Sequence, residues 1–368
     1  MAINPLPPFR ADHVGSLLRP KELSLARKEW REGAITQENL KSLENDHIRA
    51  AVIMQEQIGL QGITDGEYRR DYWHLDFMWE FDGVTQSQDV YTSKFQDENF
   101  TARAAEISGH VSYPKDGIML EDFRFLNEIV SKTAKITNPS AAQFRHREGV
   151  RLANTNAYAD MYEFWEEIGT AYNDAVSAFA DLGCKYLQID DVNSALLCDP
   201  RIRTGFEKYG GLPDQMLDVN IKANNAALAN RPKDMRATIH LCRGNFQSTY
   251  AGEGGYEFLA EKFLTQMDVN GFFMEFDDDR SGDFTPLKFL PRDKYVVIGI
   301  MTSKIPKLET KDELKRRIDE AAKFIPLEQI SISPQCGFAS TKEGNKLSEA
   351  NQWRKLERLV EVAEEVWG

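Results

Sequence analysis

The sequence has few cysteines, a deficit of basic residues and no long apolar runs. Its 368 residues include 45 Lys and Arg against 58 Asp and Glu, which gives a formal net charge of −13. Nucleic acids and anionic membranes bind basic surfaces, so neither is expected as the main partner. We expect a small-molecule substrate instead. Four cysteines are too few for a disulfide scaffold in a chain of this length: Cys184, Cys198, Cys242 and Cys336.

Long hydrophobic segments are also missing. No run approaches the roughly 18 consecutive apolar residues of a membrane span. The first eight residues lack the charged-then-apolar pattern of a secretory signal, so we expect a cytoplasmic protein. A homo-oligomer is compatible with this composition.

Strand-like and helical segments alternate along the chain, which indicates parallel βαβ units. Eight strands close a (β/α)8 barrel, and such barrels reach this length as one domain. We therefore predict an α/β fold, a single TIM barrel spanning residues 1–368. The predicted strands are 11–15, 62–65, 134–137, 185–190, 237–241, 272–275, 295–300 and 329–333, and the clearest predicted helices are 38–58, 155–182, 312–324 and 349–366.

Two stretches do not fit the alternation. Residues 71–113 are rich in aromatic and acidic residues, and their alternating pattern predicts a hairpin inserted after the second strand. Residues 199–217 are predicted to form a loop after the fourth strand. Both should project from the carboxyl-terminal face, where such barrels carry their chemistry.

Metal-ligating residues end three of the predicted strands. His240 and Cys242 occupy alternate positions and therefore project from one face, and Glu275 and Cys336 end two later strands. Imidazole, two thiolates and a carboxylate form a set suited to zinc. An isolated His-x-Cys pair could equally be a core histidine beside a small apolar cysteine. Glu275 favours the metal, because an unpaired carboxylate in an apolar strand needs a cation.

Other strand ends carry further polar residues. Ser16, beside Gly15 and before a helix, offers a hydroxyl and backbone N–H groups to a carboxylate. Acidic residues at two strand tips could bind an ammonium group. Several of these side chains have structural alternatives, since Asp65 and Asp191 could be capping residues and His13 could pair with the backbone. Together they predict a pocket for an amino acid that carries a thiol.

These residues resemble the catalytic barrel of cobalamin-independent methionine synthase over Arg10 to Gly337. In that family a His-x-Cys, a later Glu and a Pro-x-Cys-Gly motif bind zinc. The resemblance implies that homocysteine binds through Ser16 at its carboxylate and through Glu67 and Asp190 at its amino group. It implies a zinc site formed by His240, Cys242, Glu275 and Cys336.

Two family features are missing from this sequence. The family's catalytic His after the seventh strand is replaced by Met301 or Thr302, and the Trp after the third strand is absent, with Phe144 the nearest aromatic residue. Phe144 is therefore our candidate for binding the methyl donor, and His13 and Asp191 are candidate general acids. The donor stays open among 5-methyltetrahydrofolate, methylcobalamin and a methyl group delivered by a partner.

Three functions are compatible with the sequence. The first is a zinc-dependent methyltransferase that makes methionine from homocysteine. The second is a zinc-dependent alkyltransferase of the type that adds coenzyme M to epoxides, in which arginines would bind the sulfonate. The third is a non-catalytic barrel with a closed, structural zinc site. The arginines available for a sulfonate are Arg69, Arg70, Arg201, Arg203 and Arg243.

Overall fold

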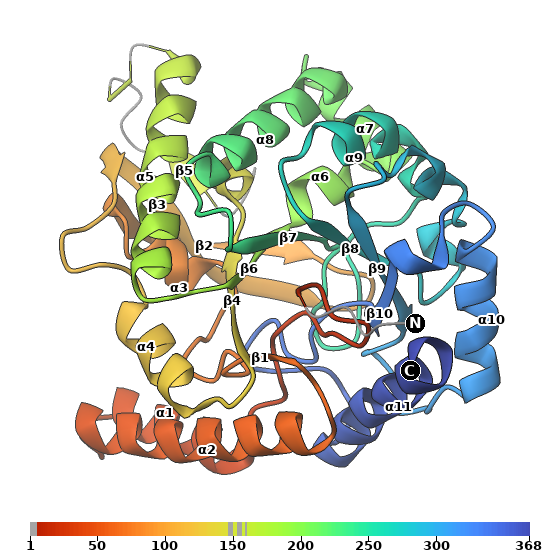
Figure 1. Ribbon diagram of the computed structural model, residues 1–368. Coiled ribbons are helices and arrows are strands. Elements are labelled where there is room, and N and C mark those ends of the chain that lie inside the picture. Colours follow the sequence, from red (N-terminus) through yellow and green to blue (C-terminus); the bar gives the residue numbers. More distant parts are fainter. Residues whose placement is uncertain (1–5, 146–149, 153–156, 159) are drawn as a thin grey trace.

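The computed structural model describes residues 6–145, 150–152, 157–158 and 160–368. Seven parallel strands curl around a common axis, and helices surround them (Figure 1). In sheet order the strands are β1 (Gly62–Ile63), β4 (Thr133–Pro139), β6 (Tyr186–Asp191), β7 (Arg236–Leu241), β8 (Gly271–Glu275), β9 (Tyr295–Met301) and β10 (Ile330–Pro334). The predicted α/β barrel architecture is confirmed, and seven of the eight predicted strands are present.

The first predicted strand, 11–15, is wrong. Ala11 makes a single isolated parallel bridge to Ile332 of β10. Side chains occupy the backbone groups that a strand ladder would use: Lys135 donates to the carbonyl of His13, and Gln188 donates to that of Val14 at 2.7 Å. The segment nevertheless fills the gap between β10 and β1.

Contacts on both sides of this segment close the barrel. The Asp12 N–H donates to the Ile332 carbonyl at 3.0 Å. On the other side, the Thr64 hydroxyl, just after β1, donates to the Gly15 carbonyl at 2.7 Å. Residues 11–15 therefore hold the place of an eighth strand without forming one.

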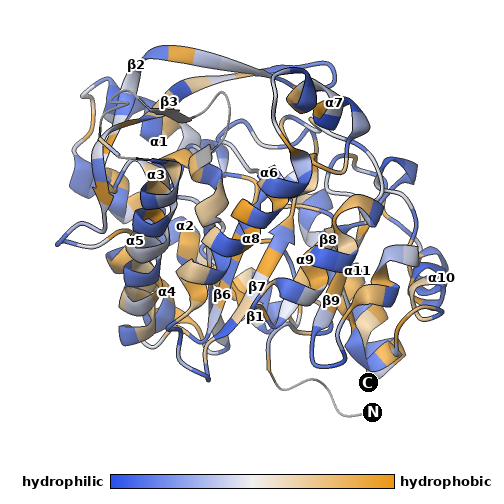
Figure 2. Cartoon of the chain, turned by 90° about the horizontal axis from the view of Figure 1, so that it is seen from above, coloured by the Kyte–Doolittle hydropathy of each residue, from blue (hydrophilic) through white to orange (hydrophobic). Residues whose placement is uncertain are grey.

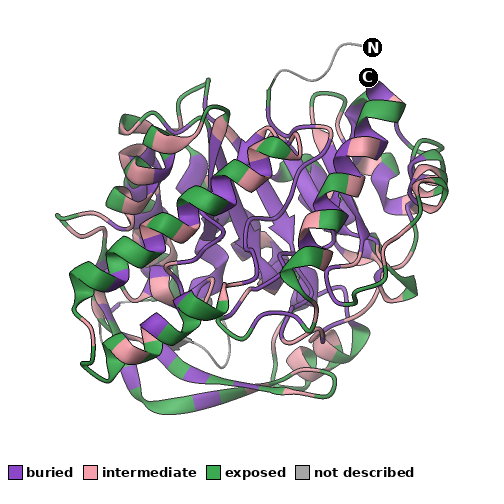
Figure 3. Cartoon of the chain, turned by 90° about the horizontal axis from the view of Figure 1, so that it is seen from below, coloured by how far each residue is buried: buried purple, intermediate pink, exposed green. Residues whose placement is uncertain are grey.

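The barrel strands form a buried inner layer. The strands β6, β8 and β10 are buried along their whole length, as parallel strands covered on both faces must be. Figure 3 shows this buried centre, ringed by helices whose outward faces are exposed. The helix α2 (Gln37–Gln57) is one example: it begins after Thr36, whose side chain caps the Asn39 N–H, and it buries Leu40, Ile48 and Val52.

The predicted helices 38–58, 312–324 and 349–366 are confirmed as α2, α10 (Lys311–Ala321) and α11 (Glu349–Trp367). The helix predicted over 155–182 is α5 (Met161–Asp181), and residues 155, 156 and 159 lie outside the described residues. The other helices are α1 (Lys21–Arg31), α3 (Leu75–Met78), α4 (Leu120–Ile129), α6 (Val192–Leu196), α7 (Pro200–Lys208), α8 (Pro213–Leu228) and α9 (Ala260–Gln266), with short 3-10 turns η1 (Ala141–Arg145), η2 (Tyr256–Phe258), η3 (Asp279–Ser281), η4 (Thr285–Phe289) and η5 (Leu327–Gln329).

The loop predicted over 199–217 is also wrong, because α7 and the start of α8 occupy it. The Asp199 side chain accepts the Arg201 N–H, and Pro200 is the first helical residue. Proline at the first position and aspartate at the cap are strong helix-start signals.

The inserted hairpin is present after the second predicted strand. Its strands β2 (Asp82–Lys94) and β3 (Asn99–Ser112) pair antiparallel, and β5 (Val150–Leu152) joins β3. Figures 2 and 3 show the hairpin lying across one end of the barrel, away from the chain termini. It therefore covers the carboxyl ends of the barrel strands.

The opposite end of the barrel is covered by the first described residues. The Pro7 carbonyl accepts the Arg236 Nε–H at 3.0 Å, at the start of β7. Pro8 packs so closely on Gly271, the first residue of β8, that a side-chain carbon there would lie 3.0 Å from its ring. Among the described residues, no helix combines the length and apolar character needed to cross a membrane.

Candidate functional site

Four metal-ligating side chains meet at the carboxyl ends of three barrel strands. His240 lies in β7, Cys242 follows it, Glu275 ends β8 and Cys336 follows β10. All four are buried, and one ligand atom from each lies within 4.8 Å of the others. Zinc bonds of about 2.0–2.3 Å place neighbouring ligand atoms roughly 3–4 Å apart. The structure thus brings the four predicted ligands close enough to share one ion after small movements.

The two thiols and the imidazole of the cluster fit a zinc ion. The sulfur atoms of Cys242 and Cys336 are 3.4 Å apart. A hydrogen bond from Cys242, aided by His240, holds the pKa of the Cys336 thiol well below its ordinary value. Neither ring nitrogen of His240, which is 2% exposed, has a hydrogen-bond partner among the described residues. Such an unsatisfied buried imidazole beside paired sulfurs is what a bound cation would satisfy.

Glu275 differs from the sequence-based expectation of an unpaired carboxylate. Its Oε2 accepts a hydrogen bond from Arg280 Nη1 at 2.9 Å, and its Oε1 accepts the Arg243 N–H at 2.9 Å. Burial alone would raise the pKa of Glu275, but the positive charges of Arg280 and Lys304 lower it. This carboxylate therefore has a cationic partner in the protein itself.

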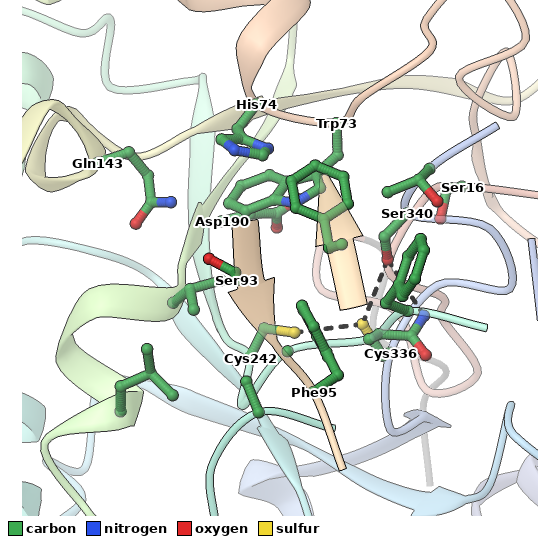
Figure 4. Close-up of a pocket in the computed structure, with 18 of the residues that line it drawn as sticks. Ser16, Trp73, His74, Ser93, Phe95, Gln143, Asp190, Cys242, Cys336 and Ser340 are labelled. Carbon is green, nitrogen blue, oxygen red and sulfur yellow. Dashed lines mark hydrogen bonds between the residues drawn. The ribbon is translucent and has the colours of Figure 1, made fainter. Parts of the chain in front are cut away.

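A cavity of about 200 Å³ opens above the metal-ligating residues. Three of the four candidate ligands line it, and Ser16, Glu67 and Asp190 line it too. Figure 4 shows the two sulfurs at one side of the cavity, with Trp73 and His74 at another. The predicted substrate-binding residues and the candidate metal centre therefore share one pocket.

The two carboxylates of the pocket are buried with few partners. Glu67 accepts a hydrogen bond from the Thr137 hydroxyl at 2.9 Å, and its other oxygen has no partner among the described residues. Asp190 accepts one from Gln188 at 2.8 Å. Burial raises the pKa of Glu67 and raises that of Asp190 to about 7. Two such carboxyl groups offer a site for an ammonium group.

Glu67 has a constrained backbone as well. Its φ of 58° is in the left-handed region, which is uncommon for residues other than glycine. The carbonyl of Glu67 accepts a hydrogen bond from Arg19 at 3.0 Å, and its N–H donates to Asp65 at 2.8 Å. These bonds hold the side chain toward the cavity.

The candidate acids lie elsewhere. His13 is not among the lining residues, and its Nε2 lies 3.2 Å from the Gly62 carbonyl. Burial, aided by Lys135, lowers the pKa of His13 to about 4. Asp191 also lies outside the lining and caps α6, where it accepts both the N–H and the hydroxyl of Ser194. Their geometry favours the structural alternatives, and their role as acids stays a prediction.

Phe144 lies in the core rather than in the pocket lining. Its ring packs edge-on against Phe81 at 5.6 Å and against Tyr172 at 5.8 Å between centroids. Its neighbour Gln143 lines the cavity instead. Its proposed contact with a methyl donor is therefore a prediction without support from this geometry.

Aromatic side chains that the sequence analysis did not single out form the far wall of the pocket. Phe246, which follows β7, lies 5.5 Å from both Phe95 and Phe100 between ring centroids. Trp73 and His74 lie 4.6 Å apart. The aromatic richness of residues 71–113 was the available signal. We call this set the aromatic wall: Trp73, His74, Tyr91, Phe95, Phe100 and Phe246.

Positive charge is scarce in the pocket. Among the described residues, the lining contains Lys94 but none of the five arginines considered for a sulfonate. Two examples show where those arginines are engaged: Arg69 pairs with Glu44 at 2.9 Å, and Arg201 pairs with Asp199 at 2.7 Å. The pocket therefore suits an amino group better than a sulfonate.

Comparisons with known proteins identify the family of this chain. The family "Cobalamin-independent synthase, Catalytic domain" matches residues 9–365. YxjH of Bacillus subtilis, which carries no assigned function, is 42% identical over 98% of this chain and 95% of its own length. A 5-methyltetrahydropteroyltriglutamate–homocysteine methyltransferase from Thermotoga sp. is 21% identical over 90% of this chain, which spans only 42% of that enzyme.

Two solved structures have the same fold. A candidate vitamin-B12-independent methionine synthase from Listeria monocytogenes is 33% identical, with a TM-score of 0.81 over 99% of this chain and all of the other. A B12-independent methionine synthase from Shewanella sp., solved with selenomethionine, has a TM-score of 0.77 at 20% identity, covering 99% of this chain and 98% of the other. This chain belongs to the cobalamin-independent methionine synthase catalytic-domain family.

Proposed function

We propose that this protein is a zinc-dependent methyltransferase that converts homocysteine to methionine. One observation carries the proposal: His240, Cys242 and Cys336 line the same cavity as the buried carboxyl groups of Glu67 and Asp190. A thiol group and an amino group of one small molecule could therefore be bound together.

The metal would be held by the four clustered side chains. Bound zinc lowers the pKa of a coordinated thiol, so that a thiolate is available at neutral pH. Glu67 and Asp190 would bind the ammonium group, and the Ser16 hydroxyl, 3.4 Å from the Ala339 nitrogen, would face the carboxylate. The pocket would align the substrate sulfur with the methyl group of the donor.

The methyl donor would approach from the aromatic wall, which faces the metal-ligating side. The sulfur–methyl bond forms while the donor–methyl bond breaks, and the thiol proton is released. An apolar wall favours a donor with an aromatic or apolar body. Candidate donors are 5-methyltetrahydrofolate, methylcobalamin and a methyl group presented by a partner protein.

A crystal of the zinc-loaded protein soaked with homocysteine tests this proposal. We expect the substrate sulfur at roughly 2.3 Å from the metal and its nitrogen near Glu67 and Asp190. A sulfur bound elsewhere would contradict the proposal. A closed four-ligand metal that never admits the thiol would instead support the structural-zinc alternative.

A further inference from the structure

Glu275 lies behind the pocket rather than in it. Among the described residues, the cavity lining includes His240, Cys242 and Cys336 but not Glu275, which is 0% exposed. The other three candidate ligands thus face the space a substrate would enter. Glu275 is therefore the candidate ligand that a substrate thiol could replace on the metal.

Arg280 holds the Glu275 carboxylate from the side. Its Nη1 lies 2.9 Å from Glu275 Oε2, its Nη2 lies 2.8 Å from Asp277 Oδ1, and its Nε lies 3.3 Å from Asp278 Oδ2. Only 5% of the Arg280 side chain is exposed. Asp277 and Asp278 thus fix the guanidinium beside Glu275.

The positive charge of Arg280 matters because Glu275 is buried. A buried carboxylate that leaves a metal ion needs another cation, since an uncompensated buried charge is strongly unfavourable. Arg280 supplies that cation, and the buried Lys304 amine lies 4.0 Å from Asp277 in the same cluster. The Arg243 N–H also donates to Glu275 at 2.9 Å, and together these groups give the carboxylate an alternative to the metal.

We propose that Arg280 is a positioning residue that holds the Glu275 carboxylate off the metal while the substrate thiol occupies the fourth coordination position. This inference rests on the proposed function. Glu275 fills the position when the thiol is absent, and Arg280 receives the carboxylate when the thiol binds. The exchange needs only a small movement, because Glu275 already contacts Arg280 and lies within 4.8 Å of the other ligand atoms.

Thiol titration of the cobalt-substituted, full-length protein tests this role of Arg280. Thiolate binding to Co²⁺ is read from the charge-transfer absorption, with homocysteine and, separately, 2-mercaptoethanol as probes. Arg280→Met should weaken the binding of both thiols at least tenfold, because Glu275 then stays on the metal. It should also release cobalt to a chelator more slowly than the wild type. The double variant Arg280→Met/Glu275→Gln should recover thiol affinity, since no charged ligand must be displaced.

Arg231→Met is the matched control. Arg231 forms a two-bond pair with Asp268, at 2.8 and 3.0 Å, outside the cluster, so its loss should change neither thiol affinity nor cobalt release. Three results would overturn the role of Arg280: unchanged thiol affinity in Arg280→Met, faster cobalt loss from that variant, or no recovery of thiol affinity in the double variant. Each would leave the proposed function standing. A wild type that binds neither thiol would overturn both.

Discussion

At the residue scale, the two clustered thiols should decide whether metal is retained. Cys242→Ser and Cys336→Ser are expected to lose most of the zinc while the barrel stays folded, because the site lies at the strand ends and outside the main core. Metal analysis and circular dichroism measure both effects. Cys184→Ser is the control, because Cys184 is buried like the other two cysteines but lies outside the cluster. This variant should keep about one zinc per chain. Zinc retained in both cluster variants would reject the assignment.

The carboxyl groups of the pocket should set the preference for an amino acid. Glu67→Gln and Asp190→Asn are each expected to weaken homocysteine binding about ten- to a hundredfold, because a charge-assisted hydrogen bond contributes roughly 1.5–3 kcal/mol. Zinc content should not change. Calorimetric titration measures the affinity, with 3-mercaptopropionate as a comparison that lacks the amino group. Equal losses for the two thiols would reject an ammonium site.

His13 should make the folded state sensitive to acid. Its pKa of about 4 in the folded protein lies below the ordinary 6.5, so the unfolded chain binds more protons between these values. The stability contributed by neutral His13 is complete above pH 6.5 and is lost as the pH falls toward 4. At pH 5 this loss should be about 2 kcal/mol.

Urea unfolding of the metal-free protein at pH 7, 6 and 5 measures that loss. His13→Gln keeps a donor for the Gly62 carbonyl but does not titrate, so its stability should fall by about 2 kcal/mol less over this range. Buried acids such as Asp122, whose pKa burial raises to about 6, act in the opposite direction and cancel in the comparison. Equal slopes for both proteins would show that His13 is not held neutral.

At the element scale, the insertion over residues 71–113, which includes Trp73 and the hairpin, should control binding of the methyl donor. Trp73→Ala removes part of the aromatic wall and is expected to raise the KM for the methyl donor severalfold, with zinc content and homocysteine affinity unchanged. Phe144→Ala is a contrasting variant, because its core position predicts a loss of about 3–5 kcal/mol of stability with an unchanged donor KM. Steady-state kinetics and thermal unfolding separate the two. A donor KM raised by Phe144→Ala alone would restore the prediction made from the sequence.

The elements also show what the sequence could reveal. Barrel strands such as β7 and β8 were predictable because buried parallel strands are short apolar runs between polar ends. Residues 11–15 have the same appearance, but distant side chains take their backbone groups, which no local pattern reveals. The helix α7 was predictable in principle, because Asp199-Pro200 is a start signal that the loop interpretation overlooked.

Part of the site was likewise predictable from the sequence, and part was not. His240, Cys242, Glu275 and Cys336 could be grouped because parallel strands end at one edge. The pairing of Glu275 with Arg280 could not be predicted, since it depends on how the loop after β8 folds back. The membership of the aromatic wall depends likewise on how the hairpin lies across the barrel.

At the scale of the whole molecule, the pocket predicts which donor works. Neither predicted acid, His13 or Asp191, lines the cavity, so protonation of a pterin nitrogen there would have to come from another lining group, such as His74 of the aromatic wall. We expect poor turnover with 5-methyltetrahydrofolate alone and at least equal turnover with methylcobalamin. Methionine formation from homocysteine, with each donor in parallel, measures this. Fast folate turnover that is abolished by His13→Ala and Phe144→Ala would contradict the expectation.

The placement of the two chain ends has a practical consequence. Pro7 and Pro8 pack at the base of β7 and β8, and Gly368 lies at the same end of the barrel, whereas the hairpin and pocket occupy the other end (Figures 2 and 3). A sensor surface that captures the protein by a peptide tag at either end would therefore leave the pocket mouth facing the flowing solution. Thiols and methyl donors could then be screened by surface plasmon resonance without shielding the site.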